Sequence, residues 1–202
     1  MTAHRLTPRQ LAAVYRCLRR DFPLAERKPL WMMLISQRHG RYEPYVFWEK
    51  GRPVAYGFLA TAPGCRWALL DYLAVQPAAR GSGIGTRVLQ ELARLCAGRW
   101  DGLLIECEAP DYAPDADAAR RRIGFYRRAG AVPLGRDSLV YGVRYRLLAL
   151  PARGGKAPGG DETVRAIRTL YRAMRPAGVP CLPLRFFEVE ELAGYGGDIT
   201  YP

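Results

Sequence analysis

The sequence predicts one α/β domain in which a mixed central sheet is flanked by helices, followed by a C-terminal extension. Three observations predict this class: two strand-like segments are separated by a short turn, an apolar strand leads into a glycine-rich loop and an amphipathic helix, and strand and helix patterns then alternate. The chain of 202 residues is long enough for one domain with a substantial core. We expect the domain to span residues 1–150, and residues 151–202 to form a linker and an extension that packs on it.

Two helices are predicted before the first strands. Thr7 and Pro8 are typical of a helix start, because a capping hydroxyl is followed by proline in the first turn. Apolar residues then recur at helical spacing over residues 11–18. Residues 29–37 predict a second helix, and Gly40 is expected to end it.

Three strands are predicted in the middle of the chain. Residues 45–48 and 54–60 are strand-like and are joined by a turn at residues 49–52, so they are expected to pair in antiparallel fashion. Residues 66–75 contain the run WALLDYLAV, whose mostly apolar composition is typical of a strand covered on both faces. The glycine loop, a helix ending at Gly98 and a strand at residues 103–107 follow, which predicts a parallel right-handed crossover.

The last third of the chain is read in the same way. Residues 118–128 predict a helix that Gly130 closes. Alternating apolar residues predict a single strand; they are Leu139, Tyr141, Val143, Tyr145 and Leu147. Residues 151–160 have the composition of a linker, and residues 162–174 predict a further helix.

Composition restricts the function classes. The net charge is +12, and all but three of the 31 basic residues are arginine. This balance fits a nucleic acid, an anionic membrane or an anionic cofactor, and it fits equally well the amino-acid bias of a GC-rich genome.

Cysteines, histidines and apolar runs argue against several kinds of site. Five cysteines without a C-x-x-C spacing predict no disulfide framework and no zinc site, and they favour a reducing cytoplasm. The two histidines, His4 and His39, are too few for a histidine-rich metal centre, so no metal is expected. The first ten residues contain no apolar signal core, and no stretch is long and apolar enough to span a bilayer.

The most informative motif is ARGSGIGTRVLQEL, residues 79–92, in which a glycine-rich turn opens a helix. A P-loop requires a lysine after its glycines, and none follows here. A dinucleotide fingerprint, G-x-G-x-x-G, requires glycine where this chain has Thr86, and an acidic partner on a following strand that is not evident. A third pattern, Arg/Gln-x-x-Gly-x-Gly/Ala, is matched in full by Arg80, Gly83 and Gly85.

With this loop placed after a YLAV strand, the chain resembles the GNAT superfamily of N-acetyltransferases. The resemblance rests on LDYLAVQPAARGSGIGTRVLQEL at residues 70–92, on the strand LLIECE, and on RRRIGFYRRAGAV at residues 120–132. The order of elements fits from about residue 6 to residue 148. The resemblance implies the mixed-sheet acyltransferase fold of that family, with acetyl-CoA as cosubstrate.

The resemblance implies that the glycine loop holds the pyrophosphate of acetyl-CoA. Glycines leave room for backbone N–H groups to face an anion, and the helix that begins there adds its positive end. In the family, the strand before the loop also lends backbone groups to the pantetheine arm, in a slot between two diverging strands. The expected cofactor-binding residues are Leu73, Ala74, Val75, Arg80, Gly81, Ser82, Gly83, Ile84, Gly85 and Thr86.

The implied reaction moves an acetyl group from the thioester to a primary amine by direct attack. Tyr126 stands at the tyrosine of the family's downstream element and is expected to protonate the departing sulfur, because a phenol with a pKa of about 10 is neutral at pH 7. An alkylammonium with a pKa of about 10.4 must first lose a proton. Glu106 is the preferred base, Glu108 and Asp71 are alternatives, and an amine that arrives neutral needs none.

The acceptor is described only by charge. Residues 106–117, ECEAPDYAPDAD, carry five acids and no basic residue. This run predicts a negative field that attracts a cationic amine, either a small molecule or a peptidyl amine; a solvated acidic loop is the alternative. The single basic stretch RRRIGFYRR is insufficient to predict a nucleic-acid surface, and no membrane partner is expected.

Two questions stay open at this level. A non-catalytic acyl-CoA-binding or regulatory module of the same fold would keep the glycine loop without needing Tyr126. The extension after residue 150 carries apolar and aromatic residues that favour docking, and three roles fit it: completing the acceptor pocket, covering a sheet edge, or forming a homodimer contact.

Overall fold

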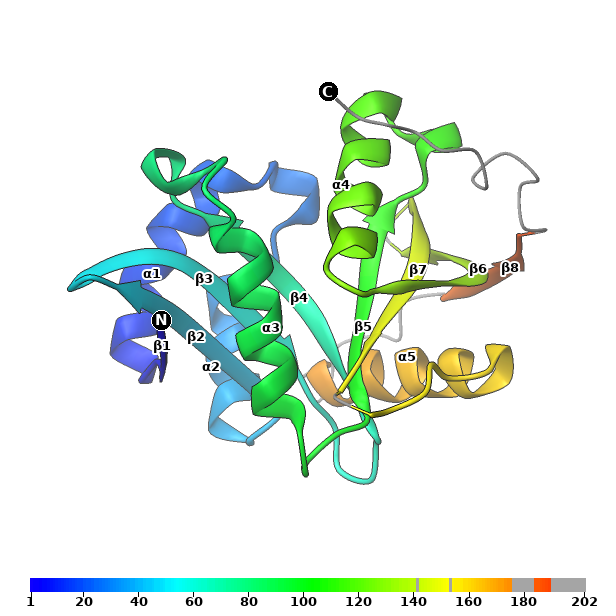
Figure 1. Ribbon diagram of the computed structural model, residues 1–202. Helices are drawn as coiled ribbons and strands as arrows, with labels where there is room; N and C mark the ends of the chain where they lie inside the picture. Colours follow the sequence, from blue (N-terminus) through cyan, green and yellow to red (C-terminus); the bar gives the residue numbers. More distant parts are fainter. Residues whose placement is uncertain (141, 153, 176–183, 190–202) are drawn as a thin grey trace.

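A single mixed sheet with helices on both faces forms the framework of the protein (Figure 1). The computed structural model describes residues 1–140, 142–152, 154–175 and 184–189. Within these residues the strand order is β1-β2-β3-β4-β5-β7-β6-β8. The predicted α/β class with a mixed central sheet is therefore confirmed.

The described elements follow one another in an order close to the one predicted. The strands are β1 (Thr2–Arg5), β2 (Tyr42–Glu49), β3 (Arg52–Ala60), β4 (Trp67–Val75), β5 (Gly102–Glu108), β6 (Val132–Val140), β7 (Val143–Pro151) and β8 (Arg185–Glu188). The helices are α1 (Pro8–Asp21), α2 (Leu30–Arg38), α3 (Ile84–Cys96), α4 (Ala116–Arg128) and α5 (Gly160–Met174). Short 3-10 turns are η1 (Leu24–Glu26), η2 (Pro77–Ala79) and η3 (Pro110–Tyr112).

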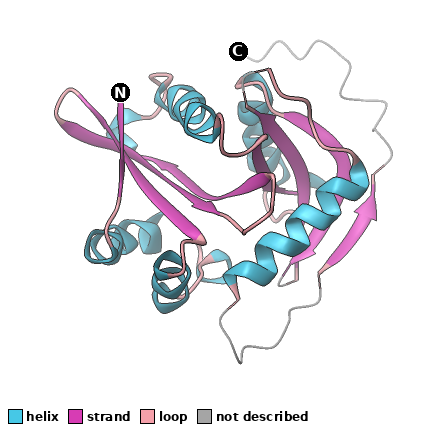
Figure 2. Cartoon of the chain, turned by 90° about the horizontal axis from the view of Figure 1, so that it is seen from below, coloured by secondary structure: helices cyan, strands magenta, loops and turns pink. Residues whose placement is uncertain are grey.

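Two cores lie on the two faces of the sheet. Helices α1, α2 and α5 bury apolar side chains against one face, for example Leu11, Met33 and Leu170. Helices α3 and α4 cover the other face with residues such as Leu92 and Ile123. The two helical layers are visible on opposite sides of the sheet in Figure 2.

Local signals in the first part of the chain are confirmed. The Thr7 hydroxyl accepts from the N–H of Gln10, and the Gln10 side chain accepts from the N–H of Thr7, which is a capping box at the start of α1. Gly40, with φ of +67°, follows α2 as expected. Strands β2 and β3 pair in antiparallel fashion across the predicted turn.

Strands β4 and β5 pair in parallel, as predicted, but only over part of their length. Residues 67–70 pair with residues 102–105, and the pairing then stops. Beyond that point β4 continues along β3, whereas β5 continues along β7. The sheet is therefore split between its two halves, and the diverging slot implied by the family resemblance is present (Figure 1).

The single strand predicted from residue 139 to residue 147 is wrong. Strand β6 ends at Val140 and β7 begins at Val143, so the segment is a tight hairpin. Gly142 has φ of +81°, which glycine adopts without strain, whereas Tyr141 lies outside the described residues. The alternation of apolar residues continues through the turn because both strands of the hairpin have the same two-residue period.

The C-terminal extension packs onto the sheet. Helix α5 buries Ile167 and Leu170 in the core, and the Trp67 indole donates to Glu162 at 3.0 Å. Strand β8 pairs with β6 and covers that edge of the sheet. The sequence analysis did not predict β8, nor β1 at the start of the chain. Leu192 and Cys181 lie outside the described residues.

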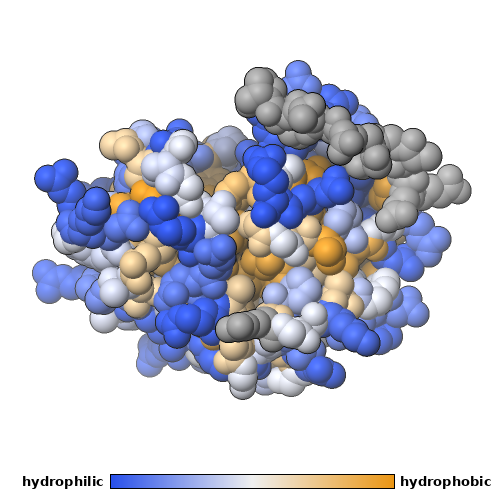
Figure 3. Space-filling view, viewed as in Figure 1, coloured by the Kyte–Doolittle hydropathy of each residue, from blue (hydrophilic) through white to orange (hydrophobic). Residues whose placement is uncertain are grey.

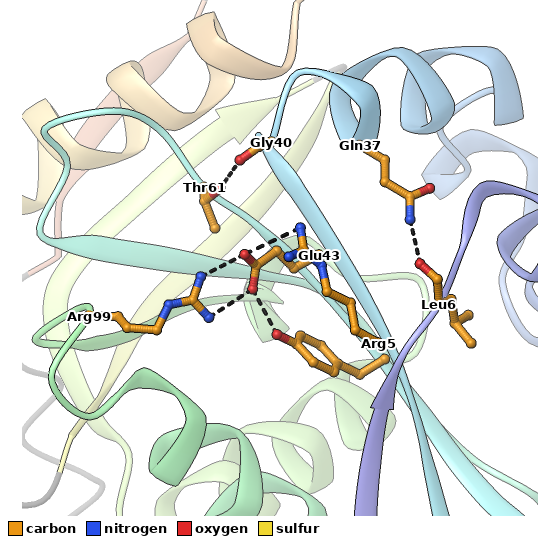
Figure 4. Close-up of polar contacts among 8 residues, drawn as sticks. Arg5, Leu6, Gln37, Gly40, Glu43, Thr61 and Arg99 are labelled. Carbon is orange, nitrogen blue, oxygen red and sulfur yellow. Dashed lines mark hydrogen bonds and ion pairs between the residues drawn. The ribbon is translucent and has the colours of Figure 1, made fainter.

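A buried glutamate on β2 ties the first strands to the loop after α3 (Figure 4). Glu43 accepts two hydrogen bonds from Arg99, at 2.6 and 3.0 Å, and one from the Tyr45 hydroxyl at 2.8 Å. Arg5 of β1 forms an ion pair with it at 3.5 Å. Burial alone would raise the pKa of Glu43, but these donors outweigh it and the pKa lies below its ordinary value. We call these four residues the Glu43 network.

Candidate active site

The glycine loop between β4 and α3 has the geometry of an anion-binding turn. Gly81 and Gly83 have φ of +75° and +73°, and Gly83 is the N-cap of α3. Across the residues that the structure describes, the N–H groups of residues 81–86 donate no hydrogen bond to an acceptor outside α3. These donors, together with the positive end of a 13-residue helix, favour a negatively charged ligand.

Each remaining residue of the loop motif has a distinct structural reason. Arg80 Nε donates to the Val75 carbonyl at 3.1 Å and so attaches the loop to the end of β4. The Ser82 hydroxyl donates to the Ala79 carbonyl at 2.8 Å. A Cβ at Gly85 would lie 3.0 Å from the Phe125 ring, so this glycine allows α3 to pack closely on α4. Gly85 therefore positions helices, whereas Gly81 and Gly83 shape the loop.

A cavity of about 330 Å³ lies where β4 and β5 part. Four of the predicted cofactor residues line it: Leu73, Ala74, Val75 and Arg80. Residues 81–86 are not among its lining residues and form the adjoining loop. In the space-filling view, apolar side chains gather in the middle of this face between α3 and α4, with hydrophilic side chains on either side (Figure 3).

Tyr126 of α4 lines the same cavity and is buried. No hydrogen bond joins its hydroxyl to another residue in the described part of the chain. Burial, and then the neighbouring Cys107, raise the pKa of Tyr126 well above its ordinary value. The phenol therefore stays neutral, and its O–H is available to donate.

Glu106 of β5 is the first residue beyond the last β4–β5 pair, and it also lines the cavity. The Ser138 hydroxyl donates to its Oε1 at 2.7 Å, and the Tyr171 hydroxyl donates to its Oε2 at 2.6 Å. Burial raises the pKa of Glu106, and these two donors offset it only in part. This carboxylate therefore accepts a proton more readily than an exposed glutamate.

The two alternative bases are held by cationic partners. Asp71 lines the cavity, but it forms an ion pair with Lys28 and accepts from the Tyr42 hydroxyl at 2.6 Å. Glu108 does not line the cavity and pairs with Arg122 at 3.4 Å. Of these three carboxylates, Glu106 is the one whose hydrogen bonds in the described structure come from neutral hydroxyls alone.

The buried ammonium of Lys28, which pairs with Asp71, was not predicted from the sequence. Lys28 Nζ lies 5.7 Å from the ring centroid of Tyr72 and 5.6 Å from that of Tyr171. Burial alone would lower the pKa of Lys28, but the Asp71 carboxylate outweighs it and the pKa is raised. Lys28 is 43 residues away from Asp71 in the chain, so no local sequence pattern predicts this ion pair.

The acids after Glu108 serve the local structure. The Asp115 side chain accepts from the N–H of Ala118 and caps α4. Asp117 pairs with Arg120 at 3.0 Å, and Asp111 lies 3.8 Å from Arg146. None of these three aspartates is among the lining residues of the cavity, which instead include Asp21 and Glu26 from the other end of the chain.

Other kinds of chemistry find little support. In the described ranges, no group of three histidine, cysteine, aspartate or glutamate side chains is arranged to hold a metal ion. Burial raises the pKa of Cys107 to about 12, so its thiol is a poor nucleophile at neutral pH. The described helices also include none that is long and apolar enough to cross a membrane.

The comparisons with known proteins agree with this geometry. Residues 40–130 match the family model described as an acetyltransferase (GNAT) domain. Residues 40–130 therefore form an acetyltransferase (GNAT) domain. This domain and the N-acetyltransferases among the structural neighbours support the acetyltransferase class. No curated protein matches the chain in sequence.

Solved structures of GNAT acetyltransferases share the fold. A putative acetyltransferase of the GNAT family from Bacteroides thetaiotaomicron is 18% identical, with a TM-score of 0.66 over 83% of this chain and 93% of that one. The ribosomal-protein-S18-alanine N-acetyltransferase from Escherichia coli is 22% identical, with a TM-score of 0.57 over 79% of this chain and 97% of that one. A mutant spermidine N-acetyltransferase from Vibrio cholerae is 11% identical, with a TM-score of 0.56 over 75% of this chain and 93% of that one.

The GNAT match covers only part of the cavity described above. It includes β4, the glycine loop, Glu106 and Tyr126, but it ends at residue 130. Lys28 lies before it, and Ser138 and Tyr171 lie after it. The side chains that surround Glu106 thus come mainly from parts of this chain outside the matched domain.

Proposed function

We propose that the protein is an acetyl-CoA-dependent N-acetyltransferase that moves an acetyl group to a primary amine by direct attack. One observation carries the proposal: a cavity at the split of the sheet has the hydroxyl of Tyr126 and the carboxylate of Glu106 on its wall, next to a glycine loop with free N–H groups. The proposal also rests on the match of residues 40–130 to the GNAT acetyltransferase domain.

The binding of acetyl-CoA is supported by backbone geometry. Within the described residues, the edge of β4 that faces β5 has no strand partner beyond Leu70, so backbone groups of residues 71–75 are available to an extended pantetheine arm. The N–H groups of residues 81–86 are available to the pyrophosphate. When bound, acetyl-CoA supplies the activated acetyl group as a thioester.

Two side chains would handle the protons of the transfer. A new N–C bond forms and the C–S bond breaks, the proton of the attacking amine passes to Glu106, and the departing thiolate takes a proton from Tyr126. The raised pKa of Glu106 suits its role, because this carboxylate gains affinity for a proton. The raised pKa of Tyr126 keeps its hydroxyl neutral, and its position on the cavity wall, rather than its acid strength, makes it the donor.

The acceptor would be a cationic amine. Asp21, Glu26 and Glu106 line the cavity, and carboxylates favour an ammonium-bearing molecule there. Structural neighbours include enzymes named for spermidine and for an alanine of a ribosomal protein, so small and peptidyl amines both belong in the test.

Calorimetry with acetyl-CoA, followed by thiol release across a panel of amines, tests the proposal. We expect micromolar-range binding, turnover with at least one cationic amine, and strongly reduced turnover in Tyr126→Phe. Binding without turnover of any amine would favour a non-catalytic acyl-CoA-binding or regulatory module. No binding to well-folded protein would overturn both functions.

A further inference from the structure

Tyr171 of α5 reaches the cavity from outside the matched acetyltransferase domain. Its hydroxyl donates to Glu106 Oε2 at 2.6 Å, across 65 residues of chain. We propose that Tyr171 is a positioning residue that holds Glu106 oriented and ionisable, so that the C-terminal helix is a working part of the acceptor site. The inference rests on the proposed function only where it gives Glu106 the role of proton acceptor.

The geometry fixes the carboxylate from two sides. Ser138 of β6 donates to one oxygen of Glu106, and Tyr171 donates to the other, at 2.7 and 2.6 Å. Two donors on two oxygens restrain rotation of the carboxylate about its terminal bond. Because both donors lie beyond residue 130, the matched domain alone does not contain this restraint.

The groups around Glu106 explain why a hydrogen bond from the neutral Tyr171 hydroxyl affects the ionisation of this carboxylate. Lys28 and Asp71 lie nearby with opposite charges and largely cancel each other, and Tyr145 of β7 is a further neighbour. Burial disfavours the charged form of Glu106, and the Tyr171 hydroxyl favours it. The pKa of Tyr171 is itself raised well above its ordinary value, so the hydroxyl remains a donor over the working pH range.

A second contact places the ring of Tyr171. The centroid of its ring lies 5.6 Å from Lys28 Nζ, and the neighbouring α5 residues Ile167 and Leu170 are fully buried. A phenylalanine would keep the ring and these apolar contacts. Tyr171→Phe therefore removes the hydroxyl alone and isolates the effect of the hydroxyl on Glu106.

The test is a carboxyl ¹³C NMR titration of Glu106 in the full chain, with the resonance assigned by its loss in Glu106→Gln. Tyr171→Phe is expected to raise the titration midpoint of Glu106 by about one pH unit, because a hydrogen bond to an ionised carboxylate is lost. Tyr42→Phe is the matched control, since it loses a 2.6 Å bond to a different buried carboxylate, Asp71, and should leave the midpoint of Glu106 unchanged. Ser138→Ala removes the other hydrogen-bond donor to Glu106 without altering α5, and it should also raise the titration midpoint of Glu106.

The outcomes separate the inference from the proposed function. An unchanged Glu106 midpoint in Tyr171→Phe overturns the inference, whatever the activity and whatever the result with Ser138→Ala. If the midpoint rises and the acid limb of kcat/KM moves to higher pH with it, both statements hold. If the midpoint rises but that limb does not move, Tyr171 still controls Glu106, and another group accepts the proton.

Discussion

Two buried glutamates, Glu43 on β2 and Glu106 on β5, receive opposite treatment from their surroundings. Both lie on strands that have a partner on each side, and both accept a hydrogen bond from a tyrosine hydroxyl. Glu43 is also bound by Arg5 and Arg99, and its pKa is lowered. Glu106 receives only hydroxyl donors, and its pKa is raised.

The difference separates structure from chemistry. Guanidinium groups fix Glu43 as an anion that joins β1, β2 and the loop after α3, so its protonation state does not change near neutral pH. Glu106 lacks such a partner and lies on the wall of a cavity, which leaves it able to gain and lose a proton. We therefore expect changes in the two regions to divide cleanly between stability and activity.

The largest expected effect comes from the two glutamates themselves. Glu106→Gln should lower kcat/KM by about 10²–10⁴, because a general base is lost. Glu43→Gln should keep kcat/KM and lose about 1–2 kcal/mol of unfolding free energy, since its arginine partners are partly exposed. Steady-state kinetics and urea unfolding on both variants make the comparison, and a large fall in kcat with Glu43→Gln would contradict it.

Tyr126 and Tyr45 allow the same test of whether activity and stability depend on different regions. Tyr126→Phe should reduce kcat by about 10²-fold, since its hydroxyl serves as proton donor, and should leave stability nearly unchanged. Tyr45→Phe removes the 2.8 Å bond to Glu43 and should lower stability by about 1 kcal/mol with activity retained. Full activity in Tyr126→Phe would remove this residue from the chemistry.

The third prediction compares Gly83, in the predicted cofactor-binding loop, with Gly64, which lies outside that loop. Gly83 and Gly64 have φ of +73° and +71°, so alanine at either position costs about 1–2 kcal/mol of backbone strain. Gly83→Ala should in addition weaken acetyl-CoA binding by about tenfold, because relief of the strain turns the loop N–H groups away from the ligand. Calorimetry on both variants decides the point. Equal loss of affinity in Gly64→Ala would show that general destabilisation is the cause.

The smallest expected effect is a pair of opposite pH dependences. Folding lowers the pKa of Glu43, so its stabilising contribution is complete above the ordinary value of 4.5 and is lost as pH falls through the folded value. Folding raises the pKa of Glu106, so the wild type loses stability as pH rises above 4.5 through the folded value. Urea unfolding across pH should show the deficit of Glu43→Gln shrinking at low pH, and a gain for Glu106→Gln that is present only at higher pH. Parallel profiles would refute the contrast.

The sequence predicted those parts of the molecule that are locally encoded. The helix start at Thr7 and Pro8, the glycine loop and the helix after it depend on residues within a few positions of one another, so they could be predicted directly. The segment from residue 139 to residue 147 could not, because a hairpin with a two-residue turn preserves the alternation of a single strand. The sequence signal for the turn was the glycine at position 142, whose φ in the structure is +81°.

The candidate site also contains residues that the sequence predicted and residues that it could not predict. Tyr126 was found through a motif and Glu106 through its place on the strand LLIECE, and the structure brings both to one cavity. Lys28 and Tyr171 were missed because they meet their partners across 43 and 65 residues, and no spacing rule connects them. The acidic run after β5 was given too much weight, because Asp115 is a helix cap and Asp117 pairs with Arg120.

The strand order of the second half of the sheet has a consequence for synthesis on the ribosome. Strand β5 pairs with β7 along its whole length, from Gly102 opposite Pro151 to Glu108 opposite Tyr145, although β6 is made first. The nascent chain must therefore emerge past residue 151 before the apolar residues Leu103, Leu104 and Ile105 lose their open edge. A chaperone that shields this edge should bind chains stalled before β7 and release those stalled after it.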